Sequence, residues 1–268
     1  MELSNVSLAL ALTIFAGLST GIGSMIAFFA RRTNTVFLSF SLGFSAGVMI
    51  YVSMVEILPE AQKAAVNVWG DMGLWAAAGG FFAGMILIAL IDLMVPAFEN
   101  PHEPRLIEDM YQENSSNTDK KLFRTGSLAA IAIAIHNFPE GLATFVSAVQ
   151  DPSLGIVIAT AIAIHNIPEG ISVSVPVYYA TGDRKKAFVL SFLSGLSEPV
   201  GALIGYLILL PFINDGLFAL LFASVAGIMV FVSLDELLPA AREYGEAHHS
   251  VYGIIAGMMV MAISLLML

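Results

Sequence analysis

Residues 132–141 read AIAIHNFPEG and residues 161–170 read AIAIHNIPEG, so nine of ten positions match at an offset of 29. Each copy carries a histidine and a glutamate four residues apart, which places both side chains on one face of a helix. These pairs are His136 with Glu140 and His165 with Glu169. Chance similarity between apolar helices does not explain a match of this quality, so the stretch is a duplicated motif.

The rest of the sequence is strongly apolar. Hydrophobic residues make up 57% of the 268 positions, charged residues 12%, and the mean hydropathy is +0.84. Because a soluble domain is about 45–50% apolar and about 25% charged, this composition predicts a polytopic membrane protein. The chain has no cysteine, which excludes disulfides, thiolate metal sites and cysteine nucleophiles. Its formal net charge of −10 argues against a nucleic-acid partner.

The apolar stretches predict an all-α integral membrane protein with eight transmembrane helices. We place them at 6–30, 36–59, 73–98, 123–149, 153–179, 186–211, 213–239 and 250–268. Eight spans of about 20 residues use about 160 positions, which leaves no room for a large soluble domain. We therefore expect a single transmembrane domain over 1–268, with helices 1–3 in 1–98, a loop at 99–122, helices 4–5 in 123–179 and helices 6–8 in 186–268.

The basic residues predict the orientation of these spans. Ten of the 11 lysines and arginines fall in the loops after spans 1, 3, 5 and 7, and only Lys63 falls on the other side. Because cytoplasmic loops are enriched in lysine and arginine, those four loops should face the cytoplasm and both termini should face outside. The loop at 99–122 is then cytoplasmic.

Two further internal matches extend the duplication. Residues 46–61 match residues 226–241 at nine of 16 positions, and residues 17–28 match residues 195–206 at five of 12. These matches pair span 2 with span 7 and span 1 with span 6, and the members of each pair run in opposite directions. Together with the duplicated motif they predict a 3+2+3 inverted repeat, an arrangement typical of transporters with a polar site at the repeat interface.

The duplicated motif places charge near the middle of two spans. A carboxylate at the bilayer centre costs roughly 3 kcal/mol on insertion scales, and Glu198 in span 6 adds a third. No lysine or arginine lies within a span interior to offset these charges, so a bound divalent cation is the simplest compensation. Imidazole, carboxylate and amide oxygen suit a borderline or hard metal. The candidate metal residues are His136, Asn137, Glu140, His165, Asn166, Glu169 and Glu198.

Other residues of the motif favour such a site. Pro139 and Pro168 should kink their helices and free carbonyl oxygens at the depth of the metal, while Gly141 and Gly170 allow close helix approach. Glu140 and Glu169 should face each other across the pseudo-two-fold axis and bridge two metal ions. The alternative is that these side chains only form interhelical hydrogen bonds, which two antiparallel copies and a third carboxylate disfavour.

Acidic residues near the span ends predict an entrance and an exit. Span 2 ends with Glu56 and Glu60, and span 7 ends with Asp235 and Glu236. Asp92 lies towards the inner end of span 3. Because acidic mouths concentrate cations, we expect entrance or exit roles for Glu56, Asp92, Asp235 and Glu236, although ordinary solvated helix ends would look the same.

The two HNxPEG motifs, the SEP triplet at Ser197–Pro199 and LDELLPAAR at Leu234–Arg242 resemble those of the ZIP (Zrt/Irt-like) metal transporter family, in its bacterial zinc-uptake branch. The resemblance covers essentially the whole chain. It implies eight helices, outside termini and a paired metal site formed by the candidate metal residues on spans 4, 5 and 6. Many members carry a histidine-rich loop after span 3, whereas this chain has only His102 there.

The function predicted from these observations is transport of a divalent transition metal into the cytoplasm. Zn²⁺ is the first expectation, and the ligand types also admit Fe²⁺, Mn²⁺, Co²⁺ and Cd²⁺. An intramembrane metal-dependent hydrolase is the alternative, because HxxxE on a helix can hold a metal with a bound water; a metal-gated receptor or structural protein is a third. No enzymatic activity and no prosthetic group is expected. The expected partners are metal ions and the lipid bilayer of a bacterial inner membrane, and a homodimer is compatible with the sequence.

Overall fold

The computed structural model describes residues 3–29, 35–94, 118–209, 212, 214–244 and 247–267. Nearly all of these residues are helical, and none of them forms a strand. Seven of the described helical stretches are long and apolar enough to cross a membrane. The prediction of an all-α protein of membrane-spanning helices is therefore confirmed.

Five of the expected spans are single helices. These are α1 (Leu3–Phe29), α4 (Met72–Met94), α6 (Thr118–Gln150), α7 (Pro152–Thr181) and α12 (Ala247–Met267). The helix α6 contains the expected fourth span and begins at Thr118, so only residues 99–117 of the expected loop, with His102, lie outside the described residues.

Each of the other three spans consists of consecutive helical segments. The second is α2 (Thr35–Val52), η1 (Ser53–Ile57) and α3 (Leu58–Trp69). The sixth is α8 (Arg184–Gly195), α9 (Ser197–Ile204) and η3 (Gly205–Leu209). The seventh is α10 (Asp215–Val232), η5 (Ser233–Leu237) and α11 (Leu238–Tyr244).

The second span is longer than the sequence indicated, because helical structure continues through Pro59 to Trp69 instead of ending at residue 59. A proline removes one backbone donor and crowds the preceding turn, but it is tolerated in the first turn of a helix. Here Pro59 lies in the first turn of α3, directly after the π-helical segment η1.

The segments η1 and η5 are π-helical turns at equivalent positions of the second repeat. Ser53–Ile57 and Ser233–Leu237 are separated by the same offset of 180 as the matching sequences. In each, the residue after the turn donates its backbone N–H five residues back, from Leu58 to Ser53 and from Leu238 to Ser233. The two sequences therefore fold alike locally, and π-turns of this kind are frequent at functional sites.

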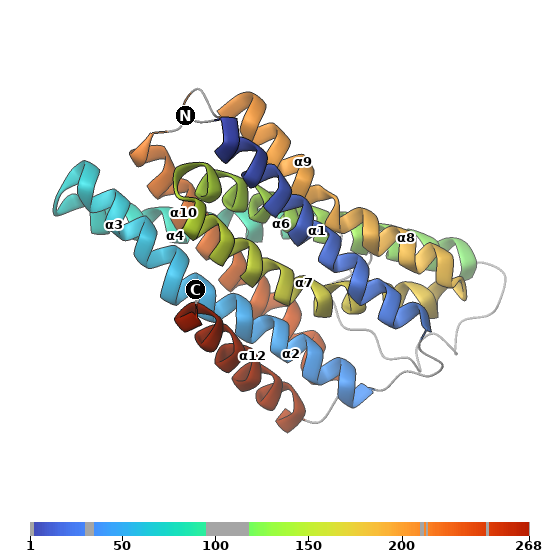
Figure 1. Cartoon of the computed structure of the whole chain (residues 1–268). Coiled ribbons are helices and arrows are strands. Elements are labelled where there is room, and N and C mark those ends of the chain that lie inside the picture. Colours follow the sequence, from blue (N-terminus) through green and yellow to red (C-terminus); the bar gives the residue numbers. More distant parts are fainter. Residues whose placement is uncertain are drawn as a thin grey trace.

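The helices pack in matching sets (Figure 1). Helix α1 packs along α7, and α6 packs along α8 and α9; α2 packs along α12, and α4 packs along α10. The two motif helices, α6 and α7, contact each other. The start of α1 and the end of α12 lie toward the same end of the bundle (Figure 1).

Glycines allow the closest of these approaches. Gly84 of α4 lies directly against the backbone of Ser224 on α10, and Gly227 of α10 lies against the backbone of Phe81 on α4. Gly47 of α2 and Gly257 of α12 make the same kind of contact, with Ile254 and Phe44. In a bilayer, where helix association depends on van der Waals packing, small residues at such crossings set the distance between helices.

We predict that Gly84→Val destabilises the bundle by about 2 kcal/mol, because an added side chain overlaps backbone that cannot move away. Gly79→Val is the matched control: it lies on the same helix, and a Cβ there meets nothing within 4 Å. Thermal unfolding in detergent, followed by size-exclusion chromatography, measures both. Equal stabilities of the two variants would contradict the packing described above.

Candidate metal site

The two motifs lie on neighbouring antiparallel helices. Helix α6 ends at Gln150 and α7 begins at Pro152. Between them, the Asp151 side chain accepts a hydrogen bond from the backbone N–H of Ser153 at 2.8 Å, which caps α7 in the way favoured at helix starts. This tight reversal brings the two HNxPEG copies side by side. Both helices run through their proline, Pro139 and Pro168, without interruption.

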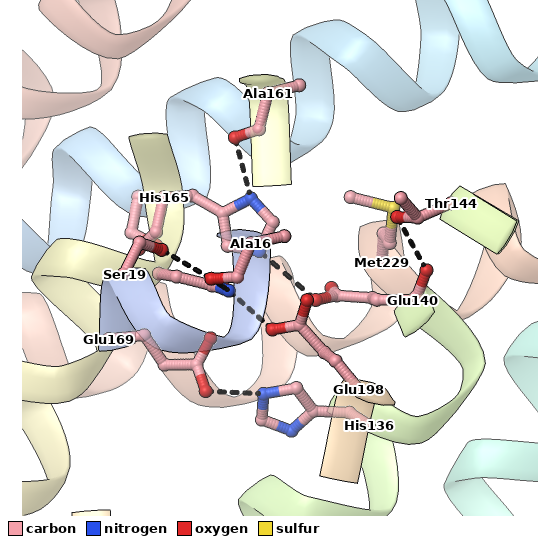
Figure 2. Close-up of polar contacts among 12 residues, drawn as sticks. Ala16, Ser19, His136, Glu140, Thr144, Ala161, His165, Glu169, Glu198 and Met229 are labelled. Carbon is pink, nitrogen blue, oxygen red and sulfur yellow. Dashed lines mark hydrogen bonds and ion pairs between the residues drawn. The ribbon is translucent and has the colours of Figure 1, made fainter. Parts of the chain in front are cut away.

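The histidine of each motif pairs with the glutamate of the other motif. His165 Nε2 lies 3.2 Å from Glu140 Oε2, and His136 Nε2 lies 3.4 Å from Glu169 Oε1. Figure 2 shows these side chains pointing toward one another from different helices. The sequence placed His136 beside Glu140 on one helix face, and the structure shows in addition that the closest contacts cross between α6 and α7.

Three of these residues form a compact cluster. One ligand atom each of Glu140, His165 and Glu169 lies within 4.8 Å of the others. The three side chains are buried, with 1%, 0% and 2% of their surface exposed. Such a spacing allows one ion to contact all three residues.

Glu198 brings a third helix to the cluster. It is fully buried on α9, and its Oε1 accepts a hydrogen bond of 2.5 Å from Asn166 Nδ2. The same amide group also donates to the backbone oxygen of Ala16 on α1, at 2.9 Å. Glu140 and Glu169 are the charged neighbours of Glu198. The sixth span is thus joined to the motif helices through a carboxylate, as the sequence indicated.

Several oxygens at this place have no protein partner. Among the buried atoms of the described residues, Glu140 Oε1, Asn137 Oδ1, Asn166 Oδ1 and Glu198 Oε2 accept no hydrogen bond. A buried polar atom without a partner is rare and costs about 1–3 kcal/mol. Carboxylate and amide oxygens, together with two imidazoles, are the donor types of a divalent-cation site, and a bound cation would give such oxygens a partner.

One predicted entrance or exit residue also reaches the site. Glu236, in η5, is buried, and its Oε2 lies 3.9 Å from His136 Nδ1. The matching residue Glu56, in η1, is half-buried, and its charged neighbours are Glu60 and Lys63. Asp92 is half-buried and Asp235 is exposed.

Backbone groups at the site were missed by the sequence analysis. His165 Nδ1 lies 3.2 Å from the oxygen of Ala161, one turn earlier on α7. Ser45 Oγ on α2 donates to the oxygen of His165 at 3.2 Å. These contacts fix the ring and the backbone of one candidate ligand, a support that orients metal-binding histidines in general. Residue types alone do not predict these backbone contacts.

The fold and the site define a multi-pass membrane protein with a buried, ligand-rich centre. The family described as ZIP Zinc transporter matches residues 99–265. The chain is 61% identical to the zinc transporter ZupT of Oceanobacillus iheyensis, over 99% of this chain and 100% of that protein. Identity with proteins of the same name is 60% in Lysinibacillus sphaericus and 59% in Clostridium perfringens, each over at least 98% of both chains. The chain therefore belongs to the ZIP family, whose members are transporters and not enzymes.

We predict that Glu198→Gln lowers the number of metal ions bound at saturation, or the affinity for one of them. Glutamine still accepts the hydrogen bond from Asn166 but lacks the negative charge, so the change isolates the charge of Glu198. Metal content and equilibrium binding of purified protein in detergent measure the effect. Asp215→Asn, at the exposed start of α10, is the control. Unchanged stoichiometry and affinity would mean that Glu198, and with it the sixth span, is not part of the metal site.

Proposed function

We propose that this chain carries Zn²⁺ across a bacterial inner membrane into the cytoplasm, through a mid-membrane site that holds two metal ions. The observation that carries this proposal is the crossed arrangement of two histidines and three carboxylates on α6, α7 and α9, all of them buried. Glu140 Oε1 and Glu198 Oε2 accept no hydrogen bond. The curated relatives are zinc transporters by name. The residues that bind the two ions in this proposal are His136, Asn137, Glu140, His165, Asn166, Glu169 and Glu198.

A two-ion site follows from the way in which the ligands are shared. Glu140 and Glu169 each lie against a histidine of the other helix, and Glu198 approaches the same two carboxylates. A carboxylate has two oxygens, so Glu140 and Glu169 can each contact two ions. His136 and Asn137 on one helix, and His165 and Asn166 on the other, then complete two coordination shells of mixed nitrogen and oxygen donors.

An inverted 3+2+3 repeat, with both termini outside, supports a carrier. Equivalent glycines make equivalent contacts: Gly141 lies against the backbone of Glu198, and Gly170 lies against that of Thr20. The packing of α2 on α12 and of α4 on α10 is likewise paired. An inverted repeat with its site at the centre is the architecture that gives alternate access from the two sides. Glu236 then lies on the cytoplasmic path and Glu56 on the external one, with Asp92 and Asp235 at the cytoplasmic mouth.

The hydrolase alternative is disfavoured by membership of a transporter family and by the site itself. A metal-dependent hydrolase keeps an open coordination position and needs a separate acid or base, whereas this site is rich in ligands.

Radiometal flux into proteoliposomes made with the purified protein tests the proposal. Uptake above that of empty liposomes is expected, and its absence at verified insertion would refute transport. Competition among metals in the same assay tests whether Fe²⁺, Mn²⁺, Co²⁺ and Cd²⁺ are also carried.

A homodimer stays a prediction, which chemical crosslinking in native membranes would check.

We predict that Glu140→Ala and Glu169→Ala each abolish uptake while the protein still inserts. Each change removes a shared ligand and one of the charges that attract the ion. The measurement is uptake per unit of protein in the membrane. Glu60→Ala, which removes a carboxylate paired with the exposed Lys63, should leave uptake near the wild-type rate. Wild-type uptake by either site variant would contradict the shared site.

Metal binding should weaken as the pH falls from about 7 to 5.5, across the ordinary pKa of histidine near 6.5. The imidazoles must be neutral and the carboxylates ionised to bind metal, so protons compete with the ion for the same groups. The sign follows directly: lower pH favours the protonated, metal-free site. Equilibrium binding in detergent, without a gradient, is the measurement. A flat profile over this range would mean that His136 and His165 are not ligands.

A further inference from the structure

Thr20 on α1 corresponds to Glu198 on α9. The match of residues 17–28 with residues 195–206 aligns these two positions. Their surroundings agree with the alignment. Gly170, next to Glu169, lies against the backbone oxygen of Thr20, and Gly141, next to Glu140, lies against the backbone oxygen of Glu198. Each residue therefore faces the glycine that follows a motif glutamate.

The two side chains also leave their helices in corresponding directions. A Cβ built on Gly195 would lie 2.7 Å from Thr20 Cβ and 2.8 Å from Thr20 Oγ1. A Cβ built on Gly17, which the alignment pairs with Gly195, would lie 3.5 Å from Glu198 Cβ. Glu198 extends from its position to Asn166, and its charged neighbours are Glu140 and Glu169. Thr20 holds the corresponding position in the opposite half.

The two halves differ in how their polar groups are satisfied. On one side, Asn166 donates a hydrogen bond to Glu198. On the other, Thr20 is fully buried and its Oγ1 has no partner, and neither Oδ1 nor Nδ2 of the equivalent Asn137 has one. A buried hydroxyl and a buried amide without protein partners each indicate a neighbouring water or ion. Packing alone does not explain them, because an apolar side chain of the same shape would avoid the cost.

We propose that Thr20 is a further residue of the metal site, where its hydroxyl holds a water molecule in the hydration shell of the transported ion. This inference depends on the proposed metal-transport function and deepens it. The hydroxyl of threonine is attached directly to Cβ, whereas the carboxylate of glutamate stands two carbon atoms further out, and a water fills that difference. A bridging water of this kind is nearly as favourable as a direct hydrogen bond.

The consequence is a difference in charge between the two halves of the site. Glu198 offers a negative oxygen on the α9 side, while Thr20 offers a neutral hydroxyl that both donates and accepts hydrogen bonds. An ion on the α9 side is therefore held by charge, and an ion on the α1 side keeps more of its water. Thr20 thus sets the affinity of the weaker half of the site without adding a further buried carboxylate.

Thr20→Val tests the hydroxyl with little change of shape. We expect affinity for Zn²⁺ to fall about tenfold, the effect typical of a lost outer-shell partner, while Thr20→Ser keeps wild-type affinity. Thr13→Val is the control, because Thr13 is fully buried on the same helix and its hydroxyl bonds to its own helix at Ala9. Binding to purified protein in detergent is measured at pH 7. Wild-type affinity in a folded Thr20→Val protein would overturn the proposal.

An exchange of the two residues tests the correspondence itself. Glu198→Thr should weaken Zn²⁺ binding by roughly 10- to 100-fold, and the double variant Thr20→Glu/Glu198→Thr should recover about tenfold or more of that loss. Thr13→Glu/Glu198→Thr is the control and should recover nothing. If Glu198→Thr binds as the wild type does, the proposed metal site fails. If Glu198→Thr is weakened and the folded exchange variant stays equally weak, only the role of Thr20 fails.

Discussion

The rest of the structure depends on the crossed histidine–glutamate contacts between two antiparallel helices. Buried carboxylates in a low-dielectric bundle need a partner, and each motif glutamate has the histidine of the other motif beside it. Two imidazoles face three buried carboxylates, so even two imidazolium charges would leave negative charge uncompensated. The arrangement is favourable with a divalent cation present. A site of this kind is therefore suited to bind and release a cation, as a transporter requires, more than to hold helices together.

This constraint explains why small residues surround the site. Short carboxylate and imidazole side chains meet only if their helices come within close reach of each other. Gly141 and Gly170, one residue after each glutamate, let α9 and α1 approach until backbone touches backbone. The serine and threonine hydroxyls nearby mostly bond to carbonyl groups one turn back, as Thr144 does to Glu140 and Ser174 does to Gly170. Polar groups in this part of the bundle are thus satisfied without adding bulk between helices.

Much of this arrangement could be predicted because the sequence repeats itself. The HNxPEG duplication identified the motif helices. The apolar stretches identified the spans, and the described residues are helical at each of them, with seven stretches long and apolar enough to cross a membrane. The repeat did not predict which side chain each motif histidine or glutamate contacts. Spacing on one helix pairs His136 with Glu140, whereas the distance that matters crosses to Glu169, and only packing determines it. The π-turns at Ser53–Ile57 and Ser233–Leu237 were missed for a similar reason, because a proline at 59 or 239 predicts a disturbance but not its form.

The two copies of the second repeat show how similar sequences can lie in different surroundings. Glu56 and Glu236 lie in π-turns of the same kind, yet Glu236 is buried beside His136 while Glu56 is half-buried beside Glu60 and Lys63. Local folding is identical, so the difference arises from how α2 and α10 are placed against the motif helices. A carrier built on the proposed inverted repeat would need such inequality, because a site equally close to both acidic residues would be equally open, or equally closed, on both sides. In the proposed carrier, the asymmetry between these two glutamates would correspond to a site that faces one side at a time.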